Sequence, residues 1–204
     1  MAIQKNILED YKNVASKMGL DLKPYEIETF SAIRSSAAHD LSATAIIDIG
    51  GSATRVVVVD YGVARVAHTI NKGSQDITLA LSKSLGMDFS KGEEVKRRAG
   101  VIGETTGGDV LNIINPTIEY ILFEASRILL NYQKKYSRSI SKVLLIGGGA
   151  LLHGIADIAT KSLEMEVKLG DPFKRLEAPV FLEPALREAG PTFAVAIGVA
   201  LKDL

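Results

Sequence analysis

The chain has 204 residues, of which 47% are hydrophobic, and its 24 basic residues balance its 24 acidic residues. This composition is typical of one globular domain or two small lobes, and it excludes a disordered or fibrous protein. The charge balance favours neither nucleic acid nor an anionic membrane surface as a partner. The lack of cysteine excludes a disulfide scaffold and a thiolate nucleophile, and no apolar run is long enough to span a membrane. We therefore expect a cytoplasmic protein without a direct membrane span.

The first forty residues predict two helices with an extended segment between them. Apolar residues recur at helical spacing over residues 7–18, which indicates an amphipathic helix. Residues 20–28 favour an extended backbone, and residues 29–38 suit a second, shorter helix. A linker over residues 37–40 is expected to lead into the rest of the chain.

Three strands are predicted next, over residues 43–49, 54–60 and 63–70. Their short connections predict an antiparallel meander. Two helices over residues 74–85 and 91–98 then indicate a small inserted lobe. Lys96, Arg97 and Arg98 close the second of these helices, where we expect a solvated cationic surface near the negative end of the helix dipole.

The second half of the chain alternates helices and strands. Helices are predicted over residues 109–132, 150–161 and 191–201, and strands over residues 142–146 and 166–169. The strand at 142–146 is continuously apolar, which is the pattern of a strand covered on both faces. A meander followed by alternating helices and strands predicts an α/β fold, a ribonuclease-H-like mixed sheet with helices on both faces.

The turn between the first two predicted strands could bind phosphate. It contains Asp48, Gly50, Gly51, Ser52 and Thr54. Backbone N–H groups in such a turn can cradle phosphate oxygens, and a carboxylate at the strand tip can hold a metal ion or its water. Glycine also supplies the positive φ that tight turns require, so a plain hairpin stays an open alternative.

A second glycine loop, Gly147-Gly148-Gly149, lies between the predicted strand at 142–146 and the helix that follows. Without side chains the backbone can approach a ligand closely, and the helix N-terminus favours anionic or ribosyl oxygens. A closely packed strand–helix turn would need the same residues. A Rossmann dinucleotide site fits poorly, because the loop lacks the G-x-G-x-x-G spacing and comes late in the fold.

Glu124 and Arg127 are three residues apart on the long predicted helix and therefore share a face. As a surface ion pair they would contribute only a few tenths of a kcal/mol. Alternatively, they could contact the base and ribose of an adenosine. Helical spacing permits both interpretations and selects neither.

Taken together, these segments resemble the second half of the PilM family, actin-like proteins of type IV pilus assembly that are related to FtsA. The resemblance is carried by residues 47–50 with Thr54, and by residues 123–129, 144–150, 171–173 and 191–201. It implies an actin-like fold. Residues 1–40 would be a remnant of the first actin-like domain, and residues 41–204 the second domain with a small inserted subdomain at about 71–108.

The resemblance also implies ATP or ADP with Mg²⁺ as cofactor. The family's motifs fall on Asp48, Gly50, Gly51, Ser52 and Thr54 for phosphate, on Gly147, Gly148 and Gly149 for adenosine, on Glu124 and Arg127 for adenine and ribose, and on Asp48 for the metal. No catalytic residue is assigned. The implied partners are a PilN-like inner-membrane protein and other pilus machinery, which would bring the protein to the periphery of the inner membrane.

One departure from the family limits the expected activity. Nothing before Asp48 resembles the family's first phosphate loop, so we expect a truncated or split form with an incomplete nucleotide site and little or no ATPase activity. Two alternatives remain. The chain could be a fragment of a sugar or acetate kinase-like phosphotransferase, which shares these loops but needs a catalytic carboxylate not found here. It could also be an interaction module that has lost nucleotide binding.

Overall fold

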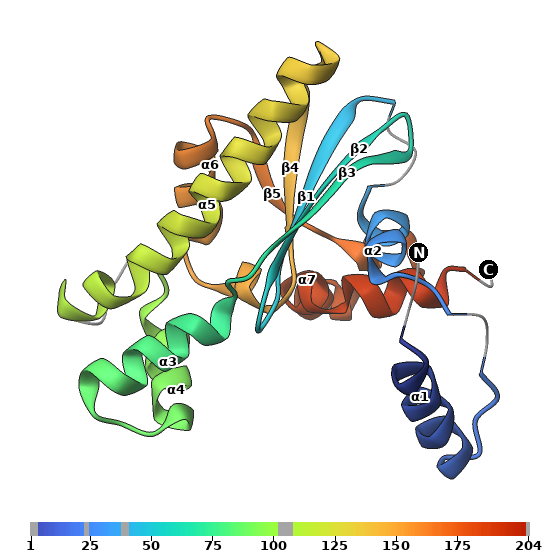
Figure 1. Cartoon of the computed structure of the whole chain (residues 1–204), viewed down its shortest axis with the longest axis horizontal. Helices are drawn as coiled ribbons and strands as arrows, with labels where there is room; N and C mark the ends of the chain where they lie inside the picture. Colours follow the sequence, from blue (N-terminus) through green and yellow to red (C-terminus); the bar gives the residue numbers. More distant parts are fainter. Residues whose placement is uncertain (1–3, 23–24, 38–40, 102–107, 203–204) are drawn as a thin grey trace.

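The computed structural model describes residues 4–22, 25–37, 41–101 and 108–202. Its centre is a five-stranded sheet in the order β3-β2-β1-β4-β5 (Figure 1). The strands are β1 (Ala43–Ile49), β2 (Thr54–Asp60), β3 (Val63–Ile70), β4 (Ile140–Ile146) and β5 (Val167–Leu169). The first three form an antiparallel meander, and β4 and β5 add in parallel beyond β1. The mixed sheet predicted from the sequence is therefore confirmed.

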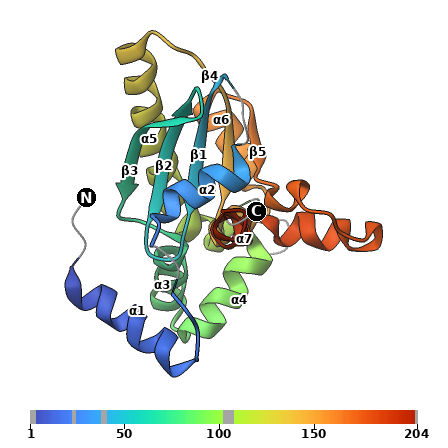
Figure 2. The same cartoon turned by 90° about the vertical axis from the view of Figure 1, so that its right-hand side faces the viewer.

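Helices cover both faces of this sheet, as Figure 2 shows. The larger core lies beneath α3 (Ser74–Leu85), α5 (Gly108–Tyr136) and α6 (Ile155–Leu163). The smaller core on the opposite face joins β1, β2 and β4 to α2 (Glu28–Ser36) and α7 (Glu183–Ala200). Because both faces are covered, β1 and β2 are buried along nearly their whole length, which explains their continuous runs of β-branched residues.

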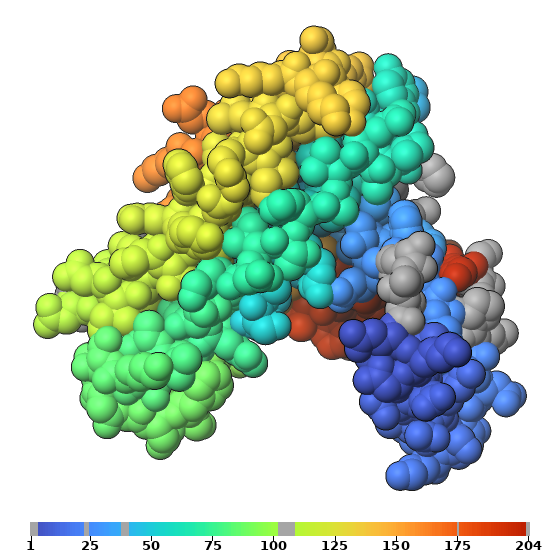
Figure 3. Space-filling model, viewed as in Figure 1, coloured from blue at the N-terminus to red at the C-terminus, as the bar shows by residue number. Residues whose placement is uncertain are grey.

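The remaining elements lie outside these layers. Helix α4 (Phe89–Ala99) packs on α3, and the two form the predicted small lobe at one end of the sheet. Helix α1 (Lys5–Lys17) projects from the body of the molecule in Figure 3, and its apolar residues Ile7 and Tyr11 are exposed. Short 3₁₀ turns occur at η1 (Gly148–Leu151), η2 (Pro172–Arg175) and η3 (Val180–Leu182). Among the described residues, no helix is both long enough and apolar enough to cross a membrane.

The starts of two helices differ most from the sequence prediction. The helix expected over residues 150–161 begins as the η1 turn, and α6 starts only at Ile155 because Gly154 has a left-handed backbone with φ of 83°. The closing helix α7 begins at Glu183 rather than at Pro191. Pro184 already occupies the first turn, where proline is favoured, so Pro191 lies inside the helix instead of starting it. Residues 38–40 of the expected linker lie outside the described residues.

Candidate functional site

The two glycine loops lie side by side at one end of the sheet. Strands β1 and β4 are parallel neighbours, with Asp48 opposite Ile146, so the loops that follow both strands emerge together. A Cβ added to Gly147 would lie 2.6 Å from the carbonyl oxygen of Ile49, and one added to Gly149 would lie 2.9 Å from the Ile49 Cβ. The loops therefore touch directly, and only glycine permits this approach.

The turn between β1 and β2 also supplies acceptors for the first backbone N–H groups of α3. The carbonyl oxygens of Gly50 and Gly51 accept hydrogen bonds of 2.9 Å from the N–H groups of Ser74 and Gln75, the first residues of that helix. The small lobe is thereby fixed to the turn. The backbone geometry of the turn depends on this contact with α3, which the sequence alone does not reveal.

The same turn leaves amides exposed. Gly51 and Ser52 are exposed, and their N–H groups donate to no other group among the residues that the structure describes. Adjacent free N–H groups in a turn form a concave site for an anion. Thr54, in contrast, is buried and donates its hydroxyl proton to the carbonyl oxygen of Lys72 at 2.8 Å. This hydroxyl supports the turn, and its proton is not available to a phosphate.

Asp48 lies where the two loops meet. Its side chain is only 15% exposed, and a Cβ on Gly147 would overlap its Oδ1 atom. Burial raises the pKa of this carboxyl, and Arg55, whose Nη1 lies 3.7 Å from Asp48 Oδ2, offsets only part of that rise. Arg55 also forms an ion pair with Glu28. A buried carboxylate whose charge is only partly balanced by a neighbouring arginine is a group that a bound cation would stabilise.

The donor set near Asp48 fits Mg²⁺ better than a metal held by protein alone. Over the described ranges, no three His, Cys, Asp or Glu side chains converge on one point. Mg²⁺ characteristically keeps several waters and binds through one or two carboxylates together with phosphate oxygens. One carboxylate beside free amides meets that requirement.

The three glycines of the second loop have different roles. Gly147 has φ of 84° and donates its N–H to the carbonyl oxygen of Pro191 at 2.8 Å, which ties α7 to the loop. Gly149 is buried against Ile49. Gly148 is exposed, and a Cβ added to it would meet nothing within 4 Å. The fold therefore requires Gly147 and Gly149, whereas Gly148 leaves open space that a ligand could fill.

Glu124 and Arg127 form an ion pair of 2.6 Å on α5. The Arg127 side chain is 59% exposed and lies in a cavity beside β3. In the sheet order, β3 is three strand spacings from β4, about 14 Å at roughly 4.8 Å each. The structure thus groups Arg127 with β3 at the edge of the sheet, and no described hydrogen bond or ion pair joins Glu124 or Arg127 to the glycine loops.

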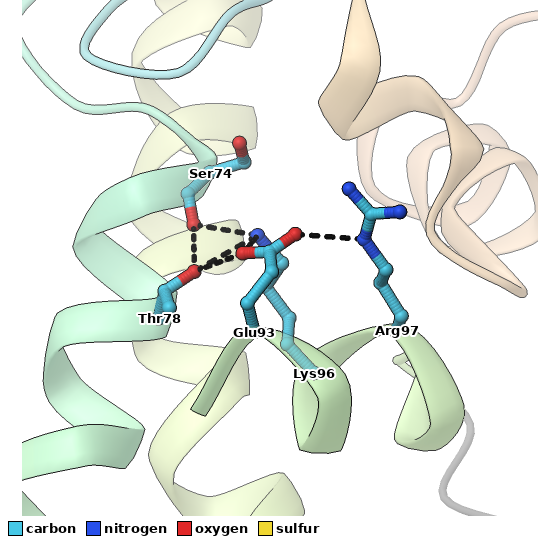
Figure 4. A network of polar contacts seen from close by, with 5 residues as sticks. All are labelled: Ser74, Thr78, Glu93, Lys96 and Arg97. Atoms are coloured by element: carbon cyan, nitrogen blue, oxygen red, sulfur yellow. Dashed lines mark hydrogen bonds and ion pairs between the residues drawn. The ribbon is translucent and has the colours of Figure 1, made fainter. Parts of the chain in front are cut away.

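A polar network on α4 was not predicted. Lys96 is only 4% exposed, and its Nζ donates to Glu93 Oε2 at 2.6 Å, to Thr78 Oγ1 at 2.9 Å and to the Ser74 carbonyl at 3.1 Å (Figure 4). The expected solvated cationic surface is therefore wrong for Lys96, because this side chain turns inward to the carboxylate of Glu93 and the backbone of α3. It holds for Arg97, which is 78% exposed and donates to Glu93 at 2.9 Å.

This network stands near the second glycine loop. The N–H of Val101, just after α4, donates to the carbonyl oxygen of His153 at 2.9 Å, so the end of α4 is joined to the segment that follows η1. In Figure 4, Arg97 rises on the side of that orange segment, whereas Glu93 and Lys96 turn toward α3. The available sequence signal was the spacing of Glu93, Lys96 and Arg97, which puts one acid and two bases on one helix face.

Comparisons with known proteins agree with this architecture. The sequence profile of the family "Type IV pilus assembly protein PilM" matches residues 1–204. The cell division protein FtsA of Helicobacter pylori strain J99 is 25% identical over 226 residues, covering 97% of this chain and 45% of that protein. FtsA of Bacillus subtilis strain 168 is 25% identical over 195 residues, covering 82% and 43%. The chain thus spans less than half the length of these relatives.

Solved structures have the same fold. A PilM–PilN type IV pilus biogenesis complex matches with a TM-score of 0.78 and 25% identity, covering 90% of this chain and 54% of the other. MreB5 of Spiroplasma citri bound to AMPPNP matches with a TM-score of 0.71 and 18% identity, covering 98% and 65%. The second likeness concerns the fold alone. Because the family profile extends over the whole chain, the chain belongs to the PilM family of actin-like type IV pilus assembly proteins.

Proposed function

We propose that this chain binds ATP or ADP with Mg²⁺ at the two glycine loops. The observation that carries the proposal is the meeting of three features at adjoining strand ends. These are the free amides of Gly51 and Ser52, the largely buried carboxylate of Asp48 and the open space at Gly148. The amides would donate to phosphate oxygens, Asp48 would hold the water shell of Mg²⁺, and the nucleotide would pass over Gly148.

We further propose that Glu93 and Arg97 contact the adenosine end, in preference to Glu124 and Arg127. Support comes from the hydrogen bond between Val101 and His153, which brings α4 next to the second glycine loop. Arg127 instead shares its cavity with residues of β3. The AMPPNP named with the MreB5 structure supports a nucleotide in a protein of this fold.

The two arginines allow a matched test. Both are exposed, both lie on helices, and each pairs with a glutamate three or four residues before it. We expect Arg97→Ala to weaken ATP binding by about three- to tenfold, the loss of one hydrogen bond or cation–π contact, and Arg127→Ala to leave it unchanged. The opposite pattern would restore Glu124 and Arg127 as the adenosine contacts.

We expect little or no ATP hydrolysis by the chain itself. Hydrolysis requires cations that stabilise the charge developing on the phosphate. Two cationic side chains near the phosphate turn already form ion pairs. Lys72 pairs with Asp76 at 2.8 Å, and Arg55 pairs with Glu28 and lies 3.7 Å from Asp48. The role we propose is therefore that of a cytoplasmic nucleotide-binding scaffold in pilus assembly. Robust phosphate release by the purified chain, abolished in Asp48→Ala, would favour an enzyme instead.

We propose a PilN-like inner-membrane protein as partner, because the structural match with a TM-score of 0.78 is a PilM–PilN complex. We also propose the division into residues 1–40 and 41–204 with an insertion at about 71–108. The projecting helix α1 and the α3–α4 lobe support that division, although α2 packs tightly on α7. Co-purification of the chain with the cytoplasmic segment of a PilN protein tests the partner.

Calorimetric titration of ATP into the purified chain tests the cofactor. We expect saturable binding that is tighter with Mg²⁺ than with EDTA, and an Asp48→Ala variant that loses this difference while it retains the metal-independent part. Equal ATP affinity with Mg²⁺ and with EDTA in both proteins would show that Asp48 does not hold the metal ion. A chain that binds no nucleotide at all would favour the pure interaction module.

A further inference from the structure

A hollow outside the glycine loops lies between β3 and α5. It has a volume of about 530 Å³, and we call it the β3–α5 groove. Its charged and aromatic lining consists of Arg65, His68, Arg127, Lys135, Tyr132 and Tyr136. Apart from Arg127, none of these residues has been considered above as a nucleotide contact.

The groove is a local concentration of positive charge on a chain whose formal net charge is zero. Two arginines, one lysine and one histidine line it, and no carboxylate does. Glu124 pairs with Arg127 and Asp60 pairs with Arg138 at 2.7 Å, so the positive charge that remains for a ligand is chiefly that of Arg65 and Lys135. A ligand that fits this lining carries negative charge.

One wall of the groove is an unpaired strand edge. β3 is the outermost strand of the sheet, and no described strand pairs with its free side. Exposed edges of this kind accept an additional strand from another chain. The register of β3 against β2 shifts between Val58 and Val59, which leaves Arg65 as the extra residue of a β-bulge. A bulge re-aims its side chain, and here Arg65 lines the groove.

The bulge and the charges also select the occupant. Regular pairing with β2 extends from Val66 to Ile70, so an added strand has a five-residue stretch of β3 available. A second copy of this chain would bring a second set of the same cations, Arg65 among them, to the shared edge, and like charges across paired strands are unfavourable. An acidic strand meets complementary charge instead.

The floor of the groove is rigid and aromatic. Tyr132 is buried, and its hydroxyl donates to Asp60 Oδ2 at 2.8 Å, which fixes the ring. The ring of Tyr136 lies 5.0 Å from it, centroid to centroid, and Lys135 Nζ lies 5.3 Å from the Tyr136 ring. Such a floor can pack against the methylene groups of glutamate side chains that an added strand turns toward α5, while the alternate residues of that strand face the other side of the sheet.

We propose that the β3–α5 groove binds an acidic peptide segment that adds a strand to the free edge of β3. The probe is a short fluorescein-labelled peptide in which glutamate and valine alternate, with a lysine–valine peptide as its control. Anisotropy titrations with the full chain should give saturable, salt-sensitive binding of the acidic peptide only. Equal binding of both peptides, or of neither, overturns the proposal.

Charge reversal locates the site. Arg65→Glu and Lys135→Glu should each weaken binding about fivefold or more, since an attraction becomes a repulsion. Lys12→Glu, an exposed lysine on the distant α1, should change nothing. Lys135 is exposed on α5, so its variant keeps the test valid if Arg65→Glu fails to fold. Unchanged affinity in Lys135→Glu and in folded Arg65→Glu contradicts the proposal.

Backbone pairing is tested with two acidic peptides, each N-methylated at a different alternate set of residues. A strand added to an edge turns only alternate N–H groups toward its neighbour, so one of the two should lose binding and the other should keep it. Equal binding by both peptides rules out strand addition. Binding of phosphatidylserine vesicles through Arg65 and Lys135, without binding of the peptide, would assign the groove to a membrane surface instead.

Discussion

Replacing the buried Lys96 by methionine should destabilise the small lobe. The side chain is 4% exposed, and its Nζ makes three hydrogen bonds of 2.6, 2.9 and 3.1 Å that join α4 to α3. Methionine has a similar length, so the change removes the charge and the hydrogen bonds rather than the packing. Hydrogen bonds to charged groups contribute about 1.5–3 kcal/mol, and a buried pair that loses one partner costs more.

Two features of the site reduce that cost. The Glu93 side chain is 28% exposed, and after the substitution it still accepts from Thr78 at 2.6 Å and from Arg97. We therefore expect a loss of about 2–3 kcal/mol in the free energy of unfolding. For a chain of this size, this corresponds to a decrease in Tm of about 4–12 °C.

Urea denaturation followed by far-UV circular dichroism measures this loss. Lys91→Met is the matched control, because Lys91 lies on the same helix, is 52% exposed and pairs with Glu94 at 2.8 Å. It should cost about 0.5 kcal/mol or less. The double variant Glu93→Gln/Lys96→Met should lose at least about 1 kcal/mol less than the sum of the single variants, because the two residues are coupled. If Lys96→Met costs no more than Lys91→Met, our account of the network is refuted.

Three further outcomes follow from the structure. Burial would raise the pKa of the Glu93 carboxyl, but hydrogen bonds from Lys96, Thr78 and Arg97 outweigh burial and lower it from 4.5 to about 2. Its stabilisation is therefore present above pH 4.5 and lost as the pH falls toward 2, so unfolding titrations should show the stability gap between wild type and Glu93→Gln closing over that range. Gly198→Ala should destabilise the chain by about 1–3 kcal/mol despite the higher helix propensity of alanine, because the added Cβ would lie 2.8 Å from the Ser31 Cα. An unchanged Tm would show that α2 and α7 can move apart at no cost in stability. Gly147→Ala should lower the Tm and Gly148→Ala should not, since only the first has φ of 84° and a carbonyl in the way; equal Tm values would contradict the different roles assigned to these glycines.

The sequence predicted the sheet well, because each strand carries its own signal. The run of four valines in β2 and the apolar β4 are β-branched or continuously apolar, and short turns leave the meander few alternatives. Helix α3 was predicted with its observed limits, because Gly73 and Gly86 flank it and Gly86 adopts the left-handed C-terminal cap with φ of 64°. Local chemistry decided these elements.

Other features depend on contacts that no local pattern encodes. Lys96 is a charged residue on a buried helix face, and only the position of α3 makes that burial favourable. The start of α7 was predicted at Pro191, whereas the observed helix begins at Glu183 with Pro184 in its first turn, which suits proline equally well. Helical spacing joined Glu124 to Arg127 but could not show that Arg127 shares a cavity with β3. Helical spacing identified α1 as amphipathic, but it could not show how exposed the apolar residues are, and Tyr11 is 62% exposed.

Nucleotide binding at the paired glycine loops is tested most directly at Gly148. A valine there meets no described protein atom at its Cβ, so the fold should be retained, whereas a ligand passing over the loop would be blocked. Calorimetric titration of ATP with Mg²⁺ should give one-site binding to the wild-type chain and none to Gly148→Val, with equal Tm values for the two proteins without nucleotide. Equal ATP affinity in both proteins, or no binding by the wild-type chain, would contradict the assignment of these loops to a nucleotide.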